Sequence, residues 1–170
     1  IKKALACVAD KRFAEAEEWI GQVLDSDVNH KKALVIKGAI ALEKCEFEQT
    51  ALSAKHVLEL DEWSAEAKML LGLAMMWQQH TQQAIAWFKQ VVYQQPSYWP
   101  AHYYLAEMYR QSELYRPAQR TYRITLQLLN AEMNNAGNAC ALRLPLSFPS
   151  NSFRFLCEHQ LAQFTTQDGQ

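Results

Sequence analysis

Glycine and proline are scarce in this chain, with five of each among its 170 residues. Because these residues interrupt helices and form turns, their scarcity favours long helices over many short strands. Long apolar runs are also missing. The longest one extends from Met69 to Trp77, far short of the roughly 20 residues that a membrane-spanning helix needs. We therefore expect an all-α protein without a membrane span.

An excess of charge of either sign is lacking as well. The 17 Lys and Arg residues nearly balance the 18 Asp and Glu residues. No segment carries the run of basic residues that is typical of nucleic-acid binding. We expect a protein or peptide partner and no nucleic acid.

Motifs of catalysis and of metal or cofactor binding are missing too. The histidines form no H-E-x-x-H pattern, and the sequence has no phosphate-binding glycine loop and no G-x-S-x-G. No two cysteines have metal-site or redox-motif spacing, so we expect reduced thiols and a cytoplasmic setting; they are Cys7, Cys45, Cys140 and Cys157. The sequence predicts no catalytic residue, no metal and no cofactor. It begins at Ile1 without a signal peptide, which we interpret as a piece of a longer protein.

What the sequence does contain is a repeat. Several columns of similar residues recur every 34 positions through four copies, without insertion or deletion. Two columns hold small residues: the first is Ala4, Gly38, Gly72 and Ala106, and the second is Ala16, Thr50, Ala84 and Ala118. A third column is mostly aromatic, with Phe13, Phe47 and Tyr115. A fourth is β-branched, with Val23, Val57, Val91 and Thr125. Small residues at fixed positions allow two helix backbones to approach closely. Each copy is therefore expected to form two amphipathic helices joined by a short turn.

The copy at residues 65–98 is the sharpest. Its Leu71-Gly72, Met75, Ala84, Phe88 and Pro96 fall at the spacing of the tetratricopeptide repeat (TPR), which the chain resembles over about residues 1–132. The resemblance implies a right-handed α-solenoid of TPR helix pairs with a C-terminal capping helix. The array consists of a partial first repeat (1–30) and the repeats 31–64, 65–98 and 99–132. First helices are expected at about 1–9, 31–44, 65–78 and 99–112, and second helices at about 12–25, 47–60, 81–94 and 115–130.

In stacked helix pairs, one face of each first helix lines a groove in which a peptide or helix binds. The face opposite the small-residue columns is our candidate partner-binding groove: Val35, Ala39 and Leu42, followed by Glu43; Met69, Leu73, Met76 and Trp77; and Tyr103, Glu107 and Arg110, followed by Gln111. The methionines and the tryptophan suit a hydrophobic or helical peptide, and the same apolar surface allows self-association. The alternative is that these side chains simply pack inside a tight superhelix.

After residue 132 the repeat ends. We expect a loop at 133–150, a helix at 151–165 and a polar tail at 166–170. The helix carries one apolar stripe, formed by Phe153, Leu156, Cys157, Leu161 and Phe164. A solenoid needs a cap over its exposed end, so the first interpretation is a lid. The alternatives are a tethered ligand that folds back into the groove and a functional site of its own.

One stretch, Ser97 to Leu129, is also similar to the TPR extension behind some chemoreceptor methyltransferase (CheR-type) domains. The shared phrases are Ala101-His102-Tyr103-Tyr104-Leu105, Ala118-Gln119-Arg120 and Leu128-Leu129. This resemblance implies a bacterial regulatory module in chemotaxis whose catalytic domain lies upstream of Ile1. The alternative is a TPR assembly factor or chaperone in secretion or pilus biogenesis.

Overall fold

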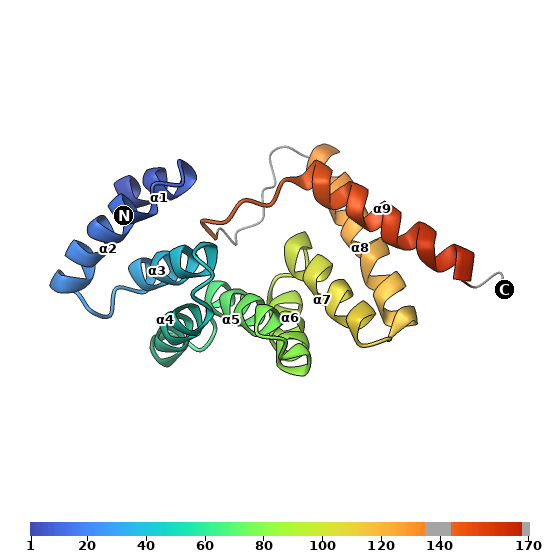
Figure 1. Cartoon of the computed structure of the whole chain (residues 1–170), viewed down its shortest axis with the longest axis horizontal. Helices are drawn as coiled ribbons and strands as arrows, with labels where there is room; N and C mark the ends of the chain where they lie inside the picture. Colours follow the sequence, from blue (N-terminus) through green and yellow to red (C-terminus); the bar gives the residue numbers. More distant parts are fainter. Residues whose placement is uncertain (135–143, 168–170) are drawn as a thin grey trace. The chain divides into compact units, whose positions relative to one another are not determined.

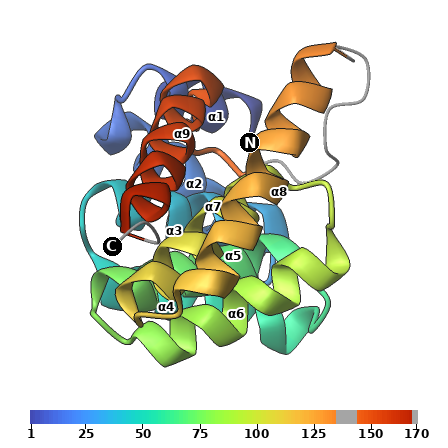
Figure 2. The same ribbon diagram turned by 90° about the vertical axis from the view of Figure 1, so that its right-hand side faces the viewer.

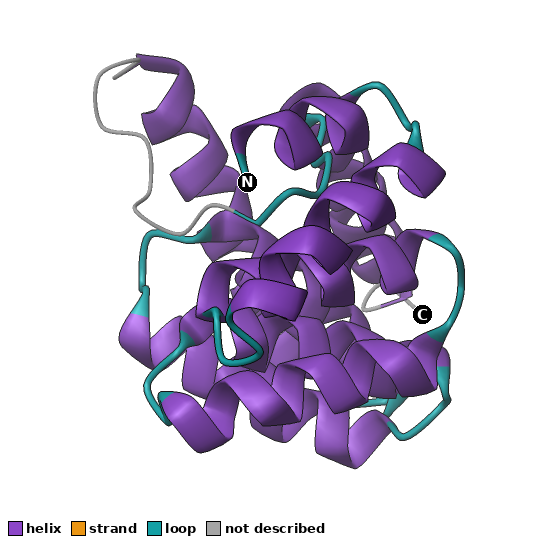
Figure 3. Cartoon of the chain, turned by 90° about the vertical axis from the view of Figure 1, so that its left-hand side faces the viewer, coloured by secondary structure: helices purple, strands orange, loops and turns teal. Residues whose placement is uncertain are grey.

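A computed structural model describes residues 1–134 and 144–167, which form helices and loops without a strand (Figures 1 and 3). The helices in these ranges are α1 (Lys2–Ala9), α2 (Phe13–Ser26), α3 (Lys31–Glu43), α4 (Phe47–Leu60), α5 (Ala65–Trp77), α6 (Thr81–Gln94), α7 (Trp99–Gln111), α8 (Tyr115–Asn134) and α9 (Ser150–Gln167). These bounds follow the expected helix pairs closely, and the all-α fold class is confirmed. Two elements are longer than expected, because α8 reaches Asn134 and α9 extends to Gln167. Much of the expected loop, with Cys140, lies outside the described residues.

The described residues divide into two compact units. Unit 1 comprises residues 1–80 and 144–147, and unit 2 comprises residues 81–134 and 148–167. In unit 1, α3 packs against α4 and both contact α5, while α2 links α1 to α3. In unit 2, α7 packs against both α6 and α8, and α9 packs on α8 (Figure 2).

The small-residue columns mark the places where helices approach each other. In unit 1, Ala4 and Ala16 have no exposed surface and belong to one core cluster with Ile20 and Ile40. In unit 2, Ala106 and Ala118 are equally buried, beside Tyr122. Fully burying one large apolar side chain stabilises a fold by roughly 1.5–3 kcal/mol. The close approach of the helices at these alanines lets the larger neighbours pack without voids.

The turn inside each helix pair repeats in the backbone although its residues differ. The residue after the cap of the first helix has a left-handed φ of 58° to 63° in all four copies; these residues are Lys11, Cys45, Gln79 and Glu113. The next amide donates a hydrogen bond to the carbonyl five residues earlier, as from Arg12 to Cys7 and from Leu114 to Tyr109. This is the Schellman arrangement, which satisfies carbonyls at a helix end. The turn ends the first helix at the same repeat position each time.

Candidate functional site

The predicted groove residues of unit 1 differ widely in exposure. Ala39, Met69 and Leu73 are buried, with 0%, 0% and 2% of their surface accessible. Val35, Leu42 and Met76 are partly buried. Trp77 is exposed, with 57% of its surface accessible. Of the apolar set on α5, only Trp77 offers a large open surface, and partner binding by the whole set stays a prediction.

The Trp77 side chain stacks against a second aromatic ring. Its ring lies parallel to that of Phe47 at the start of α4, with ring centroids 6.1 Å apart and planes inclined by 7°. Stacking of this kind restricts both side chains, while more than half of the Trp77 surface stays accessible. An exposed tryptophan that is already fixed in position can bind an apolar or cationic group with little loss of entropy.

A partly open pocket of about 470 Å³ lies on the first-helix face of unit 1. Its lining includes Leu5 and Val8 of α1, Phe13 at the start of α2 and Glu43 at the end of α3. Leu5 and Val8 stand 34 positions before Ala39 and Leu42. The pocket thus continues the predicted stripe into the first copy. Sequence reasoning started the groove at Val35 and missed these residues, although shifting the stripe by one period would have found them.

The remaining wall of the pocket comes from far along the chain. Pro145, Leu146 and Ser147 line it, and they belong to unit 1 together with α1, α2 and α3. We call Leu144–Ser147 the strap segment. It has no regular secondary structure, bends at Pro145 and Leu146, and is partly buried except at Ser147. Nothing in the repeat pattern indicates where this segment lies, because it follows the last copy.

The predicted groove residues of the fourth copy form an internal network in unit 2. Tyr103 is buried. Glu107 accepts a hydrogen bond from the Tyr122 hydroxyl of α8 and pairs with Arg110 at 2.9 Å. Burial and the neighbouring Glu107 carboxylate raise the pKa of Tyr122 well above its usual value, so this hydroxyl stays protonated and donates. In this structure these side chains hold α7 to α8.

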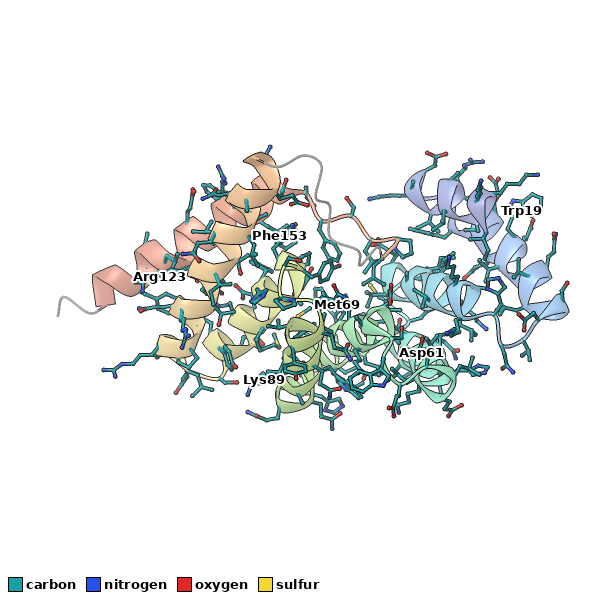
Figure 4. All side chains as sticks on the ribbon, turned by 180° about the vertical axis from the view of Figure 1, so that it is seen from behind. Trp19, Asp61, Met69, Lys89, Arg123 and Phe153 are labelled. Atoms are coloured by element: carbon teal, nitrogen blue, oxygen red, sulfur yellow. The ribbon has the colours of Figure 1, made fainter. Side chains whose placement is uncertain are left out.

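The predicted apolar stripe of α9 covers this network. Phe153, which is labelled in Figure 4, contacts the rings of Trp99 and Tyr103. Phe164 contacts the ring of Tyr122. Cys157 is fully buried and Leu161 packs against the same cluster. α9 thus packs on the last helix pair, including the predicted groove residue Tyr103. The role of α9 for the array as a whole stays a prediction.

The outer face of α9 is less polar than the lid interpretation requires. Leu156, assigned to the inner stripe, keeps 39% of its surface exposed, and Phe155 keeps 67%. The Phe155 ring stacks with His159, at a centroid distance of 6.3 Å. The predicted stripe does not include Phe155, although this residue lies between two of its members, Phe153 and Leu156.

The described ranges include reactive side chains whose pKa values are shifted by burial, among them Cys157 and His102. Among residues 1–134 and 144–167, no group of three or more His, Cys, Asp and Glu side chains is arranged to hold a metal ion. Burial raises the pKa of the Cys157 thiol to about 12, so it is protonated at neutral pH and a weak nucleophile. Burial also lowers the pKa of His102, which packs neutral near Pro96. No helix in these ranges is both long and apolar enough to cross a membrane.

Helix pairs at a period of 34 residues, joined by one repeated turn, define the class of protein: the chain folds as a TPR α-solenoid. Solved structures share this fold. MamA 41-end from Desulfovibrio magneticus RS-1 is 21% identical, with a TM-score of 0.69 over 77% of this chain and 74% of that chain. MamA AMB-1 is 16% identical, with a TM-score of 0.68 over 98% and 94%.

A third structure, YrrB, is described as a TPR protein with an unusual peptide-binding site. It is 17% identical, with a TM-score of 0.64 over 76% of this chain and 67% of that chain. At such identities the likeness concerns the fold. No protein-family model matches the sequence, and no curated protein matches it either.

Proposed function

We propose that this chain is a protein-interaction module that binds a partner peptide on the first-helix face of unit 1. The pocket beside Leu5 and Val8 is the observation that carries the proposal. It lies one period before Ala39 and Leu42, on the face of the first copy that is equivalent to the predicted stripe, and its volume is in the range of about 300–1,000 Å³ that is usual for binding pockets. The fold shared with YrrB, a TPR protein with a peptide-binding site, supports the same function.

The pocket suits an apolar side chain with polar groups near it. Leu5, Val8 and Phe13 supply apolar surface, while Lys11 and Glu43 at the edge carry charges of opposite sign. Both charged side chains are exposed and remain solvated. An apolar anchor residue would therefore provide most of the binding free energy, and the edge charges would orient the peptide. Trp77 extends this surface in our proposal as a second apolar contact on α5.

A peptide-display selection against the full chain tests the function. We expect selected peptides to share an apolar anchor and to lose affinity by about tenfold or more with Leu5→Ser, because a central apolar contact disappears. Leu52→Ser is the matched control, since Leu52 is also exposed but lies on α4 outside the pocket. Circular dichroism would verify that both variants fold. No selected peptide, or equal losses in the two variants, would contradict the proposal.

Two settings are proposed for this module. The phrases within Ser97 to Leu129 support the regulatory TPR region of a chemoreceptor methyltransferase. The alternative is an assembly factor or chaperone in secretion or pilus biogenesis. Sequencing the gene upstream of Ile1 distinguishes them. A methyltransferase core there supports the first setting, and a lipoprotein signal supports the second.

A further inference from the structure

The strap segment borders the proposed peptide site of unit 1. Pro145 and Leu146 form a wall of the same pocket as Leu5 and Val8, and the backbone bends at these two strap residues. The strap therefore shows which chemistry the first-helix face accepts from a polypeptide. That chemistry is a leucine next to a proline, in a short segment without regular secondary structure.

The strap continues directly into residues that pack within unit 2. Phe148, the next residue, belongs to unit 2, where its ring contacts Trp99 and Phe153 at centroid distances of 6.2 Å and 6.1 Å. The Pro149 carbonyl accepts hydrogen bonds from the Ser152 and Phe153 amides at the start of α9. A segment tethered this closely acts at a high effective concentration, on the order of millimolar for a short flexible linker.

The interaction between the strap and the helices α1, α2 and α3 lacks polar bonds among the described residues. Within the part of the chain that the structure describes, no hydrogen bond or ion pair joins Leu144–Ser147 to these helices. The helix residues that line the pocket beside the strap are mostly apolar: Leu5, Val8, Ala9 and Phe13. Pro145 has a nearly fixed φ and no amide donor that needs a partner, so a segment of this type binds with a small loss of entropy. A partner peptide of similar sequence can therefore take the place of the strap.

We infer that the first-helix face beside this pocket recognises a Leu-Pro-Leu type segment of a partner protein, and that the strap is the chain's own segment on this face, which the partner peptide displaces. This inference rests on the proposed function and names both its ligand class and its regulation. The tethered strap lowers the apparent affinity for partners, because the partner segment can bind in its place only after the strap leaves this face. Only a partner that presents the segment at high local concentration, or that also engages Trp77, overcomes the competition.

Fluorescence anisotropy with a labelled peptide of the strap sequence, Leu-Pro-Leu-Ser-Phe-Pro, tests the inference on the full chain. Leu146→Ser weakens the strap within the protein and leaves α1, α2 and α3 unchanged. We expect this variant to bind the peptide about tenfold more tightly than the unaltered chain, because the competitor is removed. Leu156→Ser is the matched control outside unit 1, with unchanged affinity expected. Adding Leu5→Ser to Leu146→Ser should abolish binding.

Two results would overturn the inference: equal affinity of the unaltered chain and the Leu146→Ser variant, or no saturable binding to either. A peptide that carries the same leucine-to-serine change and still binds equally well would also overturn it. Light scattering adds a third criterion. If the unaltered chain is a dimer that dissociates with Leu146→Ser, a second copy's strap fills the pocket, and the partner inference is wrong.

The proposed function and the inference fail separately. Display-selected peptides that bind through Leu5 but are indifferent to Leu146→Ser would support the function and refute the role of the strap. Absence of any Leu5-dependent peptide in the display selection would refute the proposed function itself.

Discussion

Phe153 of α9 stands edge-on to Tyr103 of α7, with ring centroids 4.6 Å apart and ring planes at 87°. This is a favourable geometry for an aromatic pair, because the positive edge of one ring faces the negative face of the other. Tyr103 had been predicted to line an open groove. The contact with Phe153 shows instead that this part of α7 is covered by the chain's own last helix.

Phe153→Ala should therefore destabilise unit 2. The substitution removes contacts with Trp99 and Tyr103. We expect a loss of roughly 2–3 kcal/mol, below the range for a fully buried phenylalanine because Phe153 is only partly buried. Phe155→Ala is the matched control, since Phe155 is largely exposed and should cost less than about 0.5 kcal/mol. Urea unfolding followed by circular dichroism measures both, and similar losses would contradict the proposed packing.

Gly21 and Gly38 should respond differently to alanine. A Cβ added at Gly21 meets no atom within 4 Å, so Gly21→Ala should stabilise the protein by about 0.5–1 kcal/mol through helix propensity. At Gly38 the added Cβ lies 3.2 Å from Leu70 Cδ1 and 3.4 Å from Ser53 Cβ. The gain at Gly38→Ala should therefore be largely cancelled, and Gly38→Val should cost about 1–3 kcal/mol. Denaturant midpoints of the three variants test this order; a destabilised Gly21→Ala would contradict it.

The repeated turns contain strain that glycine can relieve. Gln79 has a φ of 63°, whereas its neighbour Gln78 has a φ of −80°. Gln79→Gly should raise the free energy of unfolding by up to about 1 kcal/mol, because glycine has no Cβ penalty there. Gln78→Gly makes the same chemical change and should lower it by about 0.5–1 kcal/mol. Thermal unfolding distinguishes the two, and a loss in both variants would mean that the left-handed turn is not strained.

His102 should make the protein sensitive to mild acid. Burial lowers its pKa below the ordinary value of 6.5, so the unfolded chain binds the proton more readily than the folded chain. Stability is then complete above 6.5 and decreases as the pH falls toward the folded pKa. His102 Nε2 lies 2.8 Å from the Pro96 carbonyl, which can only accept, so the ring donates there.

His102→Gln keeps a donor near the same place but cannot titrate. Between about pH 7.5 and about pH 5.5, we expect its unfolding midpoint to change less than that of the unaltered chain. Carboxylates such as Asp61, whose pKa is lowered by Lys31, act in both proteins and cancel in the comparison. Parallel pH profiles of the two proteins would show that His102 does not titrate with folding.

The helix pairs could be predicted because they depend on local periodicity. Small residues such as Ala16 and Gly38 recur where helices must touch, and the period alone places every first and second helix through residue 130. The turn conformation could not be read in the same way. Lys11, Cys45, Gln79 and Glu113 have nothing in common as side chains, and their shared φ arises from hydrogen bonds between neighbouring backbone groups.

The candidate site was predictable only in part, because exposure depends on what covers a helix face. The spacing of the residues predicts that Met69 and Trp77 share one helix face. It does not predict that Met69 is buried whereas Trp77 is exposed. Glu107 could be placed on α7, whereas its bond to Tyr122 depends on the packing of α8.

The sequence by itself determined the repeat, the all-α class and the presence of a separate C-terminal helix, because a period of 34 and an apolar stripe are properties of neighbours in the chain. Only the tertiary structure decided where the non-repeating residues lie. It packs Phe153 on Tyr103 and places Pro145 and Leu146 in the wall of the pocket that Leu5 also lines, more than a hundred residues away in sequence. Such placements depend on complementary surfaces formed by several helices at once, and no local pattern encodes them.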